Sequence, residues 1–172
     1  MADETQYLIV KYVDGRVIHK KGPIQEWFNR FEHESIEAKN LYKLNSSEII
    51  IVYSRDFETT NVDRRLCVGP CLFMPKSNEW IHEFSWHIQD NNEIGHLVKT
   101  EQRFEILTNK PDFFHYYVKE VRTLDDTLIT VKLMVIFELV DIFTMLDKTQ
   151  DPISDFINAI CADVVSYVGK LK

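Results

Sequence analysis

The chain has 172 residues, a formal net charge of −7 at pH 7 and a hydrophobic fraction of 45%. This length suits one domain, or one domain with a smaller module, and the hydrophobic fraction is typical of folded rather than disordered proteins. The acidic balance, with no long basic cluster to offset it, argues against binding to a nucleic-acid backbone and against attraction to anionic lipid headgroups.

Targeting signals are the next class of feature that the sequence can exclude. No apolar run approaches the ~20 residues that a transmembrane helix needs. The first six residues are acidic and lack the cationic-then-apolar order of a signal peptide. Three cysteines, an odd number, fit a reducing compartment. We therefore expect a soluble, cytoplasmic protein.

Two β-hairpins are predicted in the first part of the chain. Residues 7–19 alternate in polarity around an Asp14-Gly15 turn, a dipeptide that favours a tight hairpin connection. Residues 49–68 have the same character around a longer polar turn. Each hairpin is followed by a Gly-Pro pair, which ends a strand because proline has no N–H to donate.

The segments after the two hairpins also resemble each other. Gly22-Pro23 and Gly69-Pro70 are followed, at nearly equal spacing, by His33-Glu34 and His82-Glu83. This similarity predicts an internal repeat of stacked modules, with chance similarity between hairpins as the alternative.

A second β-rich region leads to the C-terminal part. We predict a polar loop at residues 90–95 and a strand at 97–107. Residues 113–123 and 128–139 then predict a hairpin joined by the Asp125-Asp126 turn.

Two helices are predicted after this hairpin. A short one begins at Asp141, and a longer one begins at Asp151-Pro152, where aspartate suits the N-cap and proline the first helical position. Gly169 is expected to close the longer helix in a left-handed conformation. Helical spacing places six apolar residues on one stripe of this helix: Ile153, Phe156, Ile157, Ile160, Val164 and Val168.

One arrangement of cysteines and histidines resembles a metal site. Cys67 and Cys71, followed by His82 and His87, have the order of zinc-finger ligands. However, Gly69-Pro70 interrupts the cysteine pair, and no helix is predicted before His82. Alternation instead places both cysteines on one face of a strand, as small apolar core residues. We expect packed thiols and no bound metal or other cofactor, with structural zinc as the alternative.

Aromatic residues cluster in two places, and their neighbours are acidic rather than basic. A single-strand nucleic-acid binder would interleave its aromatic residues with lysine and arginine, so core and interface packing is the better interpretation. The residues concerned are Trp27, Phe28, Trp80, Phe84 and Trp86. The sequence also contains no nucleophile elbow, phosphate loop or metalloprotease helix, so we expect no enzyme and no catalytic residue.

The order of elements in residues 48–172 resembles the SPFH or band 7 family, which includes stomatins, prohibitins, flotillins and the shoulder of the major vault protein. The resemblance is carried by Val68-Gly69-Pro70, the turn at 123–126, the long alternating strand and the helix that opens at Asp151-Pro152. Residues 1–47 would then be a β-rich, repeat-like unit, an organisation closest to that of vault proteins. The membrane anchor of stomatins and the long coiled coil of many members are not seen in these 172 residues, which we expect to be part of a longer chain.

The resemblance implies an α+β fold in which antiparallel β-rich structure precedes an SPFH-like sheet covered by the C-terminal amphipathic helix. It also implies a non-enzymatic scaffold subunit that assembles laterally into a ring, cage or other large homo-oligomer. Residues of the helix stripe are the candidates for self-association: Phe156, Ile160, Val164 and Val168. The alternative is a peripheral adaptor that docks a protein partner or a membrane surface through exposed aromatic residues. Any association with a membrane would not use a transmembrane segment.

Overall fold

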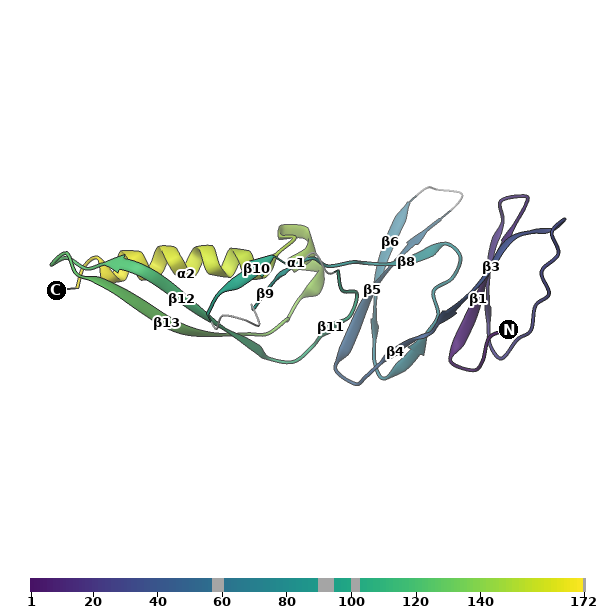
Figure 1. The fold of residues 1–172 in the computed structure, drawn as a ribbon, viewed down its shortest axis with the longest axis horizontal. Coiled ribbons are helices and arrows are strands. Elements are labelled where there is room, and N and C mark those ends of the chain that lie inside the picture. The colour runs from purple at the N-terminus through teal and green to yellow at the C-terminus, as the bar shows by residue number, and fades with distance from the viewer. Residues whose placement is uncertain (57–60, 90–94, 100–102, 172) are drawn as a thin grey trace. The chain divides into compact units, whose positions relative to one another are not determined.

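The computed structural model describes residues 1–56, 61–89, 95–99 and 103–171, and Figure 1 shows its strands and helices. The helices are α1 (Ile142–Lys148) and α2 (Pro152–Val168). The strands pair antiparallel and are, in chain order, β1 (Gln6–Tyr12), β2 (Val17–Lys21), β3 (His33–Asn40), β4 (Tyr42–Leu44), β5 (Glu48–Arg55), β6 (Val62–Val68), β7 (Cys71–Phe73), β8 (Glu79–Ile81), β9 (His87–Gln89), β10 (Leu97–Lys99), β11 (Leu107–Thr108), β12 (Asp112–Arg122) and β13 (Leu128–Phe137). The predicted α+β class with antiparallel sheets is confirmed, while the SPFH arrangement stays a prediction.

The chain forms two compact units. Unit 1 comprises Met1–His82 and Glu105–Thr108, and unit 2 comprises Glu83–Phe104 and Asn109–Lys172. The domain boundary that the family resemblance implies between residues 47 and 48 stays a prediction.

Unit 1 contains the same strand arrangement twice. β1 pairs with β2 and with β3, and β5 pairs with β6 and with β8. At matching positions the Gly22 N–H donates to the Gln6 carbonyl and the Gly69 N–H donates to the Glu48 carbonyl, each at 2.9 Å. A Cβ at Gly22 would lie 1.9 Å from the Asp3 carbonyl oxygen. The two halves therefore share this topology, and the close approach of a carbonyl explains why both positions are glycine.

The histidines that suggested the repeat do not hold equivalent positions. His33 is the first residue of β3, whereas His82 follows the last residue of β8. β3 and β8 also pair in different registers. Val10 of β1 lies opposite Ile36, the fourth residue of β3, whereas Val52 of β5 lies opposite Ile81, the last residue of β8. The His-Glu similarity is therefore a coincidence of sequence.

Each half of unit 1 has its own hydrophobic cluster. The cluster beside β1 is built on Ala2, Leu8 and Val10. The cluster beside β5 is built on Leu44, Ile50, Val52 and Ile81. The consecutive apolar residues of β5 are buried on both faces, which is why this strand shows no alternation in the sequence.

Unit 2 is a long hairpin, β12 and β13, with α2 lying along one of its faces (Figure 1). The side chains of β13 alternate strictly between partly buried and exposed, as expected for a strand with one covered face. Val118 and Val121 of β12 pack against Val168 of α2 and form the centre of the core between the two layers. A bulge lies between Val118 and Val121.

Three expectations about local structure need correction. Gly169 has φ −61° and ψ −10°, so α2 ends in a tightened right-handed turn, in which the Leu171 N–H donates to the Val168 carbonyl. Of the strand predicted over 97–107, the described residues form β10 and β11, and Phe104 forms an isolated bridge with Phe84, while residues 100–102 lie outside the described residues. Cys67 and Cys71 lie on two strands, β6 and β7, rather than on one. Apart from Gly95, the predicted loop 90–95 lies outside the described residues.

Candidate functional site

The four self-association candidates on α2 lie in different environments. Val168 is only 4% exposed, and its side chain is packed into the core of unit 2. Val164 packs against the same cluster and Ile160 is half-buried. Phe156 is more exposed, and its ring centroid lies 6.0 Å from that of Phe137. The apolar stripe is therefore buried at both ends, at Ile153 and Val168, and Phe156 is its exposed member.

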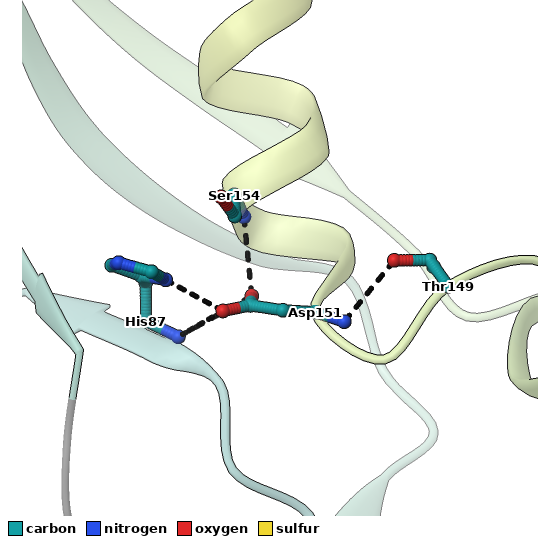
Figure 2. Close-up of polar contacts among 4 residues, drawn as sticks. All are labelled: His87, Thr149, Asp151 and Ser154. Atoms are coloured by element: carbon teal, nitrogen blue, oxygen red, sulfur yellow. Dashed lines mark hydrogen bonds and ion pairs between the residues drawn. The ribbon is translucent and has the colours of Figure 1, made fainter.

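The first turn of α2 is fixed by the carboxylate of Asp151, as Figure 2 shows. It accepts a hydrogen bond from the Ser154 N–H at 3.1 Å, which is the N-cap interaction expected from the sequence. It also accepts the His87 N–H at 3.2 Å and lies 2.5 Å from Nδ1 of the His87 ring. The Asp151 N–H donates to the Thr149 hydroxyl oxygen at 3.1 Å. One carboxylate thus caps the helix and ties β9 to it.

This role of His87 has no signal in the sequence. The spacing of His87 and Asp151 along the chain is long, and no local pattern links a strand histidine to a distant N-cap. Both side chains are partly buried in unit 2, at 26% and 17% exposed. The contact therefore fixes the start of α2 to β9.

The face of the hairpin opposite α2 carries exposed apolar side chains. We call this the outer hairpin face, and it consists of Phe113, Leu128, Met134 and Ile136, each more than half exposed. Phe113 lies directly opposite Ile136 in the strand register. Lys132 lies on the same face, with its Nζ 5.2 Å from the centre of the Tyr117 ring. This face therefore combines exposed apolar side chains with one lysine.

One flank of α2 carries an acidic residue, opposite in charge to Lys132 of the outer hairpin face. We call it the helix flank, and it consists of Phe156, Asp163 and Tyr167, which are seven and then four positions apart and so share one side of the helix. All three side chains are exposed. An acidic group lies here between two aromatic residues, so the helix flank complements the outer hairpin face in charge and matches it in apolar character.

The cysteine and histidine arrangement does not form a metal site in the described residues. The Sγ atoms of Cys67 and Cys71 lie 3.6 Å apart, and both residues pack against the hydrophobic cluster beside β5. The His82 ring instead contacts the Tyr53 hydroxyl at 3.2 Å, and His87 contacts Asp151. Among the residues that the structure describes, no group of three His, Cys, Asp or Glu side chains could hold a metal ion. The packed-thiol interpretation is confirmed.

The five aromatic residues noted in the sequence divide into packed and exposed sets. Phe84 and Trp86 are buried in a cluster with Phe104, with ring centroids 5.3–5.4 Å apart. Trp80 stacks on Tyr53 at 5.6 Å. The packing interpretation is confirmed for Phe84 and Trp86, whereas Trp80 is 42% exposed although it stacks on Tyr53.

The exposed set forms a loop that follows β2. We call it the aromatic loop, and it consists of Trp27, Phe28 and Phe31, with Trp27 80% and Phe31 85% exposed. Asn29 organises the loop, because its side-chain oxygen accepts the Phe31 N–H and its carbonyl accepts the His33 N–H at 2.7 Å. Phe31 was missed by sequence reasoning, since one aromatic residue in a polar stretch does not reveal its exposure.

The comparisons with known proteins do not place the chain in a family. No protein-family model matches this sequence, and no curated protein matches it significantly. In the part of the chain that the structure describes, neither helix combines the length and the apolar character that crossing a membrane requires.

Proposed function

We propose that this protein is a non-enzymatic scaffold subunit whose identical copies pack side by side into a large homo-oligomer. The observation that carries the proposal is the outer hairpin face, along which four large apolar side chains are exposed together with Lys132. Exposed apolar residues gathered on one face are typical of protein–protein interfaces, whereas scattered ones are ordinary. The SPFH-like order of elements supports the same proposal.

A second copy is the partner that best fits this surface. The helix flank offers Phe156 and Tyr167 around the acidic Asp163, while the outer hairpin face offers apolar residues around Lys132. If the helix flank of one copy packs on the outer hairpin face of the next, each copy contributes both halves of the contact. Such a head-to-tail interface repeats from copy to copy and generates a ring when its rotation closes.

The sheet edges support lateral assembly as well. Within the described residues, β12 and β13 form a two-stranded sheet; on the outer edge of β12 the Tyr117 N–H donates to the Gly95 carbonyl at 3.0 Å, and no further strand lies beside β13. Unpaired edges are sites at which another chain can add a strand. The bulge between Val118 and Val121 limits such pairing along β12 and favours β13 as the edge that a neighbour approaches.

The test is the oligomeric state of a matched pair of variants. Ile136 is 66% exposed on the outer hairpin face, and Val13 is 65% exposed in unit 1. Sedimentation velocity on the chain, from low to high micromolar concentration, should show association that Ile136→Asp abolishes and Val13→Asp leaves intact. A chain that stays monomeric at every concentration, or equal effects of the two substitutions, would refute the proposal.

A charge exchange tests which surfaces meet. Lys132→Glu and Asp163→Lys should each weaken association by placing like charges in contact, and the double variant should restore it. Restoration in the double variant requires that the two side chains meet across the interface. If the double variant associates no better than the single ones, the helix flank is not the surface that meets the outer hairpin face.

A second candidate function is favoured by the aromatic loop. Trp27 and Phe31 are the kind of rigid, exposed anchors that are enriched in binding hot spots. As an adaptor, the chain would dock a protein partner, because its net charge of −7 disfavours anionic membranes. Trp27→Ala with Phe31→Ala should then abolish capture of a partner without changing self-association. Flotation of the unmodified chain with anionic vesicles would point to a membrane surface instead.

A further inference from the structure

Two cysteines of unit 1 are in direct contact although neither is bonded. The Sγ atoms of Cys67 and Cys71 lie 3.6 Å apart, and both residues are free thiols. Cys67 is the last residue but one of β6, and Cys71 is the first residue of β7. The turn between these strands therefore brings the thiols together from two different strands.

The surroundings of this pair hold both sulfurs in place. The two side chains are half-buried against the cluster of Leu44, Ile50, Val52 and Ile81. β6 is fixed by its pairing with β5, where Cys67 lies opposite Ile50, and β7 is fixed by its pairing with β4, where Cys71 lies opposite Leu44. Because both strands are anchored, the thiols stay near each other in the folded chain.

We propose that Cys67 and Cys71 form a redox site that closes an intramolecular disulfide by exchange with a low-molecular-weight disulfide such as oxidised glutathione. The two thiols are held 3.6 Å apart, a separation that needs only a short approach to form a bond, and both residues are partly exposed. This modification goes beyond assembly, and it belongs to unit 1, whereas the surfaces proposed for self-association belong to unit 2.

The chemistry consists of two thiol–disulfide exchanges. One cysteine thiolate attacks a sulfur of oxidised glutathione, which forms a mixed disulfide and releases one glutathione thiolate. The second cysteine thiolate attacks the protein sulfur already bonded to glutathione, which forms the Cys67–Cys71 bond and releases the second glutathione. The chain loses two electrons and two protons, and oxidised glutathione is reduced to two molecules of glutathione.

The local environment disfavours the thiolate of one cysteine. Burial, and then the hydrogen bond with the Cys71 thiol, raise the pKa of Cys67 to about 11. The thiolate is the attacking species, so the raised pKa disfavours attack by Cys67 at neutral pH.

Cys161 provides an internal control. It lies in unit 2, and its Sγ contacts the Tyr116 hydroxyl at 3.8 Å. Having no cysteine beside it among the described residues, Cys161 can take up glutathione but cannot close an intramolecular bond in the folded chain. The two outcomes differ in mass and are therefore separable in one experiment.

The test equilibrates the folded chain with mixtures of reduced and oxidised glutathione, followed by acid quenching, alkylation and peptide mass spectrometry. We expect Cys67 and Cys71 to be linked and protected from alkylation. Half of the folded chain should be linked at a ratio of oxidised glutathione to the square of reduced glutathione that is about tenfold lower than the ratio needed in urea. This corresponds to a difference in reduction potential of about 30 mV. Cys161→Ser should leave this result unchanged.

Single substitutions show whether the second thiol is required. In Cys67→Ala and Cys71→Ala, the remaining cysteine of the pair should retain glutathione as a mixed disulfide. Circular dichroism shows whether each variant is folded. If neither variant folds, the mass measurement on the unmodified chain still tests the proposal. Mixed disulfides in place of the Cys67–Cys71 bond, or equal oxidation of folded and unfolded chains, would overturn the proposal.

Discussion

Replacing Asp151 by alanine should lower the free energy of unfolding of unit 2 by about 2–3 kcal/mol. The carboxylate caps α2 through the Ser154 N–H, and loss of an N-cap costs about 1 kcal/mol. It also accepts two hydrogen bonds from His87, from the backbone N–H and from the ring. Hydrogen bonds to a charged group contribute roughly 1.5–3 kcal/mol, and partial exposure of both side chains places this pair near the lower end.

A matched substitution separates the two contributions. Asparagine caps a helix about as well as aspartate, but it presents a neutral acceptor to His87. Asp151→Asn should therefore cost only about 1 kcal/mol. Combining Asp151→Ala with His87→Ala should cost about 1 kcal/mol less than the sum of the single substitutions, because they remove the same contact.

The assay is urea unfolding followed by far-ultraviolet circular dichroism, which reports on α1 and α2 and so on unit 2. If Asp151→Ala costs less than about 0.5 kcal/mol, the carboxylate does not anchor the helix. Equal costs of Asp151→Ala in the presence and absence of His87 would likewise refute the reasoning, because the contact would then have no energetic role.

Three further predictions concern other parts of the fold. Gly69→Ala should cost at least about 2 kcal/mol, since its Cβ would lie 1.9 Å from the Asn45 carbonyl oxygen. Gly15→Ala, which has open space but φ +87°, should cost only about 1 kcal/mol. Both glycines lie in unit 1, so urea unfolding of these variants is followed by the fluorescence of its tryptophans, Trp27 and Trp80. Val168→Ala should destabilise the fold by about 2 kcal/mol because it opens a cavity in the core, and light scattering should show self-association unchanged in the folded fraction. Burial alone would raise the pKa of Glu79, but hydrogen bonds from the Lys76 N–H and the Arg65 guanidinium outweigh it and lower the pKa. The stability that ionised Glu79 contributes should be complete above its ordinary pKa near 4.5 and lost as pH falls through the lowered pKa. In urea unfolding, the difference in the free energy of unfolding between the unmodified chain and Glu79→Gln should therefore shrink below pH ~4 and stay constant above pH ~6.

Elements with a strong local pattern could be predicted closely from the sequence. The hairpins around Asp14-Gly15 and Asp125-Asp126, and the helix that opens at Asp151-Pro152, lie where expected. Each is specified by residues that act within a few positions, through turn conformation, side-chain alternation or N-capping. Gly169 was the exception, because glycine permits a left-handed C-cap without requiring it.

The candidate site was much less predictable. The apolar stripe of α2 indicated that one face is buried, but periodicity alone cannot say where the core ends. Val168 and Ile153 are buried whereas Phe156, on the same stripe, is 39% exposed, so exposure varies along the stripe without a signal in the spacing. The alternation in β13 did not identify the outer hairpin face either, because either set of alternating side chains could have been covered.

The sequence by itself determined the α+β class, the two repeated hairpins and the start of both helices, because these depend on interactions between residues close together in the chain. Only the tertiary structure decided that Cys67 contacts Cys71 from another strand, that His87 binds Asp151, and that the apolar residues of one hairpin face remain exposed. Such contacts join segments whose separation carries no periodic signal, and they depend on which surfaces pack together when the chain buries its apolar side chains.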